Sequence, residues 1–169
     1  HLKLIIKNYK KSNSKISKIC IWAPKKTLDS LSNDKNIIKC YNPIFEFNFI
    51  IKAFWQFFFL KYNLKKNNCN ILFVPTGIFY INFKSVVVMA QNLMPFNDLI
   101  VENHFPHLIF FKMKLQKYLF IKSFNRANKI IFLSKYSKNY INKFLDKHNK
   151  NKTIISHGID SNLIKFFKK

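Results

Sequence analysis

Short apolar runs recur along the chain and predict β-strands. The most informative lies within SVVVMAQNLMPF, residues 85–96, where Val86–Ala90 is uninterrupted and rich in β-branched side chains. A run without alternation between apolar and polar residues is typical of a strand covered on both faces. Comparable runs lie at residues 19–23, 71–74, 129–133 and 153–156, and a weaker one lies at 36–41. We therefore expect Val86–Ala90 to be the central strand of a parallel sheet.

Between these runs, apolar residues recur at the spacing of amphipathic helices. The spacing predicts helices over residues 1–11, 48–64 and 108–127, and Ser134 stands at the N-cap of a fourth that extends to about residue 145. In the second helix Lys52, Gln56 and Asn63 form one narrow polar stripe, so its aromatic remainder is expected to be buried. The alternation of strand and helix predicts an α/β fold with a doubly wound, Rossmann-like parallel sheet.

Composition is compatible with one domain that has a sizeable core, because 49% of the 169 residues are hydrophobic. The net charge is +23, yet Arg126 is the single arginine and lysine is spread through every segment. Nucleic-acid binders usually concentrate basic residues and use arginine, so nucleic acid is a minority hypothesis. The positive field favours anionic ligands such as nucleotide-sugars or lipid phosphates, and peripheral contact with an anionic membrane surface.

The cysteines and the most apolar stretch indicate neither a disulfide framework nor a membrane span. Cys20, Cys40 and Cys69 lack CxxC spacing, so we expect the buried free thiols of a cytosolic protein. Phe49–Leu60 is too short to cross a bilayer and is interrupted by Lys52 and Gln56. No signal-peptide pattern is seen in the residues that begin the chain at His1.

Candidate ligand groups follow the predicted strands. In parallel α/β sheets ligands bind beyond the carboxyl ends of the strands. Four short tips qualify: Pro75-Thr76-Gly77, Gln91-Asn92, Ser134-Lys135 and His157-Gly158. They converge only if the predicted topology holds.

Three of these tips also have a structural explanation that requires no ligand. Asn92 suits a sugar hydroxyl, but an Asn at the end of a strand more often satisfies turn backbone. Ser134 leaves backbone N–H groups for an anion, with Lys135 adding charge, although ordinary capping explains it too. Gly158, one of two glycines, suggests positive φ or a close backbone approach, and His157 is either a ligand contact or a solvated or core histidine.

Several common chemistries are not indicated. Glu102, His104 and His107 are closely spaced, but no further ligand of suitable type is near them, so we expect no metal site. The seven acidic residues never fall within two positions of one another, which argues against a DxD-type metal site. GxGxxG, P-loop and GxSxG motifs are missing, and no nucleophile with an evident base stands out.

Taken in order and spacing, VVVMAQNLMPF, Glu102, SFNRANKIIFLSKYSKNYI and KTIISHGID resemble the N-terminal domain of the family 4 glycosyltransferases of the GT-B fold. The branch it resembles occurs in bacterial surface-polysaccharide clusters, and the resemblance covers most of the chain from about Cys69 onward. It implies transfer of a sugar from a nucleotide-sugar to a polysaccharide or lipid-linked acceptor, with retention and without metal or cofactor. This domain would receive the acceptor, and a following domain would hold the nucleotide.

The resemblance also implies site residues and boundaries. Gln91, Asn92 and Phe96 would line the acceptor cleft, Ser134 and Lys135 would face it, and His157-Gly158 would lead into a hinge. Residues 1–158 would be a partial acceptor-side domain and residues 159–169 the start of a linker. The family's first strand and its glycine-rich loop would precede His1 and lie between the strands at 19–23 and 71–74. The segment alone is therefore expected to be inactive and marginally stable.

Three hypotheses follow. The first is part of a glycosyltransferase located in the cytoplasm, peripherally at the inner face of the membrane. The second is a non-catalytic Rossmann-like module that binds an anionic ligand or partner. The third is a basic nucleic-acid-binding protein, whose affinity would fall steeply with salt.

Overall fold

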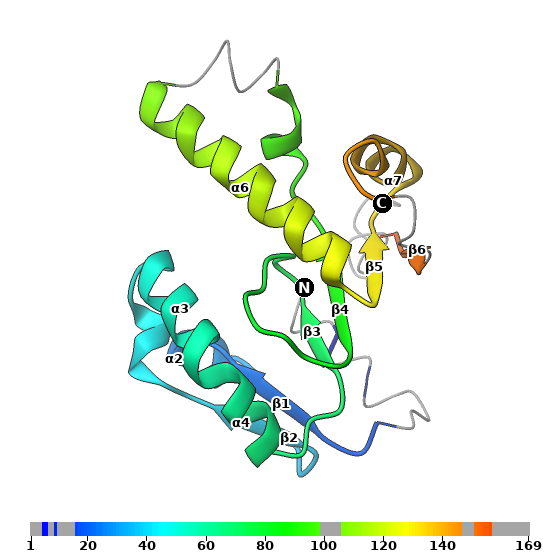
Figure 1. Ribbon diagram of the computed structural model, residues 1–169. Helices are drawn as coiled ribbons and strands as arrows, with labels where there is room; N and C mark the ends of the chain where they lie inside the picture. Colours follow the sequence, from blue (N-terminus) through cyan, green and yellow to red (C-terminus); the bar gives the residue numbers. More distant parts are fainter. Residues whose placement is uncertain (1–4, 7–8, 10–15, 99–105, 147–150, 157–169) are drawn as a thin grey trace, which may run out of the picture. The chain divides into compact units, whose positions relative to one another are not determined.

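A computed structural model describes residues 5–6, 9, 16–98, 106–146 and 151–156, which form parallel strands and intervening helices (Figure 1). The chain divides into two compact units, His1–Cys69 and Asn70–Lys169. Every strand pairing is parallel. The predicted α/β class is therefore confirmed, and the arrangement is consistent with a Rossmann-like, doubly wound fold. The predicted strands lie in two sheets, one in each unit.

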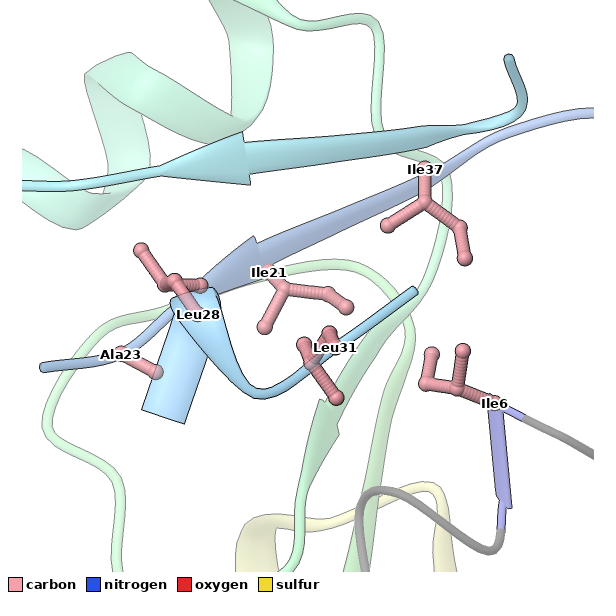
Figure 2. Packing of buried hydrophobic residues seen from close by; sticks show 6 residues of the cluster. All are labelled: Ile6, Ile21, Ala23, Leu28, Leu31 and Ile37. Carbon is pink, nitrogen blue, oxygen red and sulfur yellow. The ribbon is translucent and has the colours of Figure 1, made fainter. Parts of the chain in front are cut away.

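The first unit contains a two-stranded sheet formed by β1 (Ile19–Trp22) and β2 (Ile37–Cys40). Pro24 follows β1 and precedes the short helix α2 (Lys25–Asp29), whose Leu28 N–H donates to the Pro24 carbonyl at 3.1 Å. Figure 2 shows the small core that results. It consists of Ile6, Ile21, Ala23, Leu28, Leu31 and Ile37.

One helical segment follows the short 3₁₀ turn η1 (Pro43–Glu46). It consists of α3 (Phe49–Trp55), a π-helical turn η2 (Gln56–Leu60) and α4 (Lys61–Lys66). Asn48 caps its start, because its side chain accepts from the Ile51 N–H at 3.2 Å. The segment ends at Asn68 with φ of 52°, and the Cys69 N–H donates to the Leu64 carbonyl at 2.9 Å. Asparagine thus occupies the left-handed position that ends many helices and is usually glycine.

The orientation predicted for this helical segment is wrong. Trp55, Leu60 and Leu64 are its buried residues, and Trp55 packs edge-on against Phe45 with ring centroids 4.8 Å apart. Gln56, from the predicted polar stripe, turns inward, and its Oε1 is buried without a hydrogen-bond partner among the described residues. The aromatic surface expected to be buried is exposed: Phe49, Ile50, Phe54, Phe57, Phe58, Phe59 and Tyr62.

The second unit contains a four-stranded parallel sheet in the order β3-β4-β5-β6. The strands are β3 (Leu72–Val74), β4 (Val86–Ala90), β5 (Lys129–Phe132) and β6 (Lys152–Ile154). The predicted central strand is confirmed, since β4 pairs with β3 on one side and β5 on the other. Its alternate residues Val86, Val88 and Ala90 are buried, while Val87 and Met89 are half-buried.

In the described part of the second unit, two α-helices flank β5 in the chain. The helix α6 (His107–Arg126) precedes β5, and α7 (Lys135–Asn142) follows it. The packed side of α6 is formed by Phe120, Ser123 and Phe124 near its C-terminal end. Phe111, Leu115 and Tyr118 of the same helix are exposed.

Part of the sequence prediction falls on residues outside the described set. The helix predicted over residues 1–11 is described only at Ile5, Ile6 and Tyr9, of which Ile6 belongs to the core of the first unit. The boundary predicted at residue 158 also lies outside the described residues.

Candidate functional site

The candidate site is the edge of the four-stranded sheet at which its strands end. Adjacent parallel strands present their carboxyl ends at the same edge, and β3, β4, β5 and β6 are adjacent and parallel. The register aligns Val74 with Val88 and Ala90 with Phe132, so the following tips leave neighbouring strands. The topology on which convergence of the predicted tips depended is therefore present in the second unit.

The tip of β4 is an exposed polar pair held by local hydrogen bonds. The Asn92 Oδ1 accepts from the Met94 N–H at 3.0 Å, which forms the turn that leads into the 3₁₀ helix η3 (Met94–Phe96). Gln91 is also exposed, and its Nε2 lies 2.9 Å from the Met89 Sδ. The turn-forming role of Asn92 is thus observed.

Phe96 lies in the core rather than at the surface of the edge. Its exposed fraction is 0%, and its ring is stacked on Phe124 at 6.4 Å and tilted against Phe120 and Phe144. A 3₁₀ turn with Pro95 brings it inward, since Pro95 is buried as well. Phe96 therefore does not offer its side chain to a ligand and instead anchors the β4 tip.

The tip of β5 forms the predicted N-cap of α7. The Ser134 Oγ accepts from the Ser137 N–H at 3.0 Å, and the Ser137 Oγ accepts in turn from the Ser134 N–H at 3.2 Å. This capping box satisfies one of the N–H groups that a helix start leaves without an intrahelical acceptor. Lys135 is exposed in the first turn, beside Tyr136, whose ring stacks on Tyr140 at 5.9 Å.

The tip of β3 is a tight turn closed by a bond from the Gly77 N–H to the Val74 carbonyl at 3.1 Å. Gly77 has φ of 82°, and a Cβ there would lie 2.8 Å from Phe120 Cε1. Glycine is thus required for backbone conformation and for the close approach of α6. Thr76 beside it is exposed.

Two further groups at this edge were missed by sequence reasoning. Tyr140 Oη donates to the Phe96 carbonyl at 3.1 Å and so ties α7 to the β4 tip. Asp98 pairs with Lys117 at 2.7 Å and with Lys114 at 3.2 Å, which ties the loop after η3 to α6. The hydrogen bond from Lys117 is the main cause that lowers the pKa of Asp98, so the carboxylate stays ionised. Both contacts join residues that are distant in sequence, so no local sequence pattern predicts them.

Some predicted site residues are not described. His157 and Gly158 follow β6 but lie outside the described residues, as do Glu102 and His104. Within the described ranges, no group of three or more histidine, cysteine or acidic side chains could hold a metal ion.

The three cysteines belong to the first unit, whereas the candidate edge belongs to the second. All three are free and half-buried. Burial raises the pKa of Cys40, and burial together with the neighbouring Cys20 raises the pKa of Cys69 to about 11. These two groups are therefore protonated thiols at neutral pH.

The described tips offer hydroxyl, amide, ammonium and backbone N–H groups. Such groups can bind a hydroxylated or anionic ligand. Ser134 is engaged in capping, and no histidine or carboxylate is hydrogen-bonded to it among the described residues. Among the described residues, the arrangement therefore offers groups for binding a ligand.

Comparisons of the chain with protein-family models, curated proteins and solved structures find no match. In the part of the chain that the structure describes, no helix is both long enough and apolar enough to cross a membrane.

Proposed function

We propose that the chain is part of a retaining glycosyltransferase and contributes the acceptor side of the site. The donor is a nucleotide-sugar, and the acceptor is a polysaccharide or lipid-linked saccharide. The reaction needs no metal, and the protein works in the cytoplasm at the inner face of the membrane. These statements rest on the resemblance of residues 86–96, 123–141 and 152–160 to the family 4 glycosyltransferases.

The observation that carries the proposal is the order β3-β4-β5-β6 of the parallel sheet. This order brings the tips after β3, β4 and β5 to one edge, with Asn92 and Lys135 exposed on neighbouring tips. Amide and ammonium groups are suited to sugar hydroxyls and to a phosphate carried by the acceptor. Phe96 supports the β4 tip from the core.

A non-catalytic module that binds an anionic ligand is the alternative. It is favoured by one specific observation, which is that the described tips carry binding groups without a hydrogen-bonded acid–base pair. In the glycosyltransferase proposal, the remaining groups come from parts of the enzyme that flank this segment. The two proposals therefore differ in what the flanking coding sequence contains.

The test begins with that coding sequence. We expect a glycine-rich loop upstream and a second α/β domain with a paired-glutamate motif downstream. Given a saccharide acceptor, or water as a slower one, to receive the sugar, the extended protein should release nucleoside diphosphate from UDP-glucose, UDP-N-acetylglucosamine or GDP-mannose in the presence of EDTA, whereas the 169-residue chain should not. A complete reading frame without the second domain would reject the enzyme and favour the binding module.

Variants of the extended protein test the edge itself. Asn92→Ala and Lys135→Ala should each lower sugar transfer roughly two- to tenfold through loss of a hydrogen bond to the acceptor. Lys129→Ala is the matched control, because Lys129 is also exposed but begins β5 at the opposite end of the strand. Equal losses in all three variants would show that charge or stability, rather than this edge, controls the activity.

A further inference from the structure

The outer apolar face of the helical segment Phe49–Lys66 consists of Ile50, Phe54, Phe58 and Tyr62. Their exposed fractions are 74%, 61%, 55% and 66%. Phe54 and Phe58 contact each other, with ring centroids 4.4 Å apart. A cluster of large apolar side chains on one exposed helix face marks an interaction surface.

The π-helical turn keeps this face continuous. The buried residues Trp55 and Leu60 are five positions apart, and in a regular α-helix such residues would lie about 140° apart around the axis. The wider turn of η2 brings them to the same side. The four outer residues, spaced four apart from α3 through η2 into the first turn of α4, are all exposed.

The same segment is basic. Lys61, Lys65 and Lys66 are exposed in α4, and the sequence contains no acidic residue between Glu46 and Asp98. Apolar side chains flanked by uncompensated lysines are typical of helices that lie in the interface of an anionic bilayer. There the apolar groups enter the boundary between headgroups and acyl chains, while the ammonium groups contact lipid phosphates.

We propose that the outer apolar face binds an anionic lipid bilayer, with the helical segment lying parallel to the membrane plane. Tyr62 suits this location, since its ring is apolar and its hydroxyl remains in the headgroup region. A second copy of this face fits less well, because it offers no acidic residue between Glu46 and Asp98 to pair with Lys61, Lys65 and Lys66. The inference does not depend on sugar transfer.

The test is co-sedimentation of the full chain with vesicles of phosphatidylglycerol and phosphatidylcholine, compared with phosphatidylcholine alone. At about 0.15 M ionic strength, where the Debye length is about 8 Å, binding should be at least about tenfold stronger to the anionic vesicles. The variant Ile50→Gln, Phe54→Gln, Phe58→Gln should lose about tenfold or more in binding. The variant Lys61→Gln, Lys65→Gln, Lys66→Gln should lose about ten- to a hundredfold.

Two matched controls use exposed residues of the second unit. Leu108→Gln, Phe111→Gln, Leu115→Gln removes three exposed apolar side chains of α6, and Lys112→Gln, Lys122→Gln, Lys129→Gln removes three exposed lysines. Both controls should bind within about twofold of the parent chain, and circular dichroism verifies that each variant is folded. The proposal is overturned if the parent does not bind anionic vesicles, if lipid charge has no effect, or if the controls lose as much binding as the variants. Should the apolar variant fail to fold, the lysine variant and its control decide the result.

Discussion

At the β3 tip of the candidate edge, the backbone conformation and the close packing around Gly77 leave no room for a side chain. Its φ of 82° is unfavourable for any residue with a Cβ, and that Cβ would lie 2.8 Å from Phe120 Cε1 and 3.0 Å from the Met89 carbonyl oxygen. We expect Gly77→Ala to lower the free energy of unfolding by about 1–3 kcal/mol. Thr76→Ala, at the exposed neighbouring position, should change it by less than about 0.5 kcal/mol. Urea denaturation of both variants measures the difference, and equal values would show that the turn is not constrained.

Cys69 gives a prediction about pH. Burial and the neighbouring Cys20 raise its pKa from 9.0 to about 11. A thiol whose pKa is raised holds less of the reactive thiolate, by about a hundredfold at neutral pH here and by a smaller factor as the pH approaches the raised pKa. Labelling of Cys69 by iodoacetamide, followed by mass spectrometry, should therefore keep rising by about tenfold per pH unit between about pH 8 and 10.

The denatured chain is the control for this titration. In urea the neighbouring groups are dispersed, so the labelling rate of Cys69 should level off near an ordinary thiol pKa of about 8.5–9. The shape of the pH profile separates ionisation from simple shielding, because shielding lowers the rate by the same factor at every pH. A native profile that levels off near pH 9 would contradict the raised pKa.

At the scale of elements, Trp55 and Phe54 test the orientation of the helical segment Phe49–Lys66. Trp55 is 5% exposed and packs on Phe45, whereas its neighbour Phe54 is 61% exposed. Trp55→Ala should lower the free energy of unfolding by about 3–5 kcal/mol, and Phe54→Ala by about 0.5 kcal/mol. Chemical denaturation followed by circular dichroism compares the two. A larger loss for Phe54→Ala would mean that the aromatic side is buried, as the polar stripe had predicted.

The strands were predictable because a buried strand needs only a short apolar run, and six such runs are separated by turn residues. The existence of the helices was predictable from the spacing of their apolar residues, as α6 and α7 show. Which face of each helix is buried was not predictable. In a chain with 20 Phe, apolar side chains occupy both faces of a helix, so a polar stripe such as Lys52 and Gln56 no longer marks the solvent side. The π turn of η2 also shifts the periodicity on which the interpretation depended.

The candidate site was predictable to the level of strand tips. The carboxyl ends of parallel strands share an edge, so Asn92 and Ser134 could be placed from sequence order alone. The direction of Phe96 could not, because an apolar residue after a strand can line a surface or enter the core, and the 3₁₀ turn η3 decides which. The contacts of Tyr140 and Asp98 join residues that are distant in sequence, and only the tertiary structure reveals them.

At the scale of the whole molecule, stability should differ between the two units. The first has a two-stranded sheet and a core cluster of six buried residues, whereas in the second β4 and β5 each have two strand neighbours. Two-stranded sheets are marginal on their own, and the net charge of +23 adds repulsion within the compact chain. Both features lead us to expect that the first unit is the less stable of the two.

Hydrogen exchange measured by mass spectrometry resolves the two units. Amides of β4 and β5 should exchange slowest, and those of β1 and β2 faster by about a factor of ten or more, because the smaller unit opens without the larger one. Two of the variants above test whether the boundary between independently opening regions lies between Cys69 and Asn70. Trp55→Ala should accelerate exchange in residues 16–69 and leave β4 and β5 unchanged, while Gly77→Ala should accelerate it in β3, β4 and the end of α6, where Phe120 lies. If either variant accelerated exchange uniformly along the chain, the two units would unfold as one cooperative body. Substitutions in the outer apolar face of the first unit would then also disturb the candidate edge of the second.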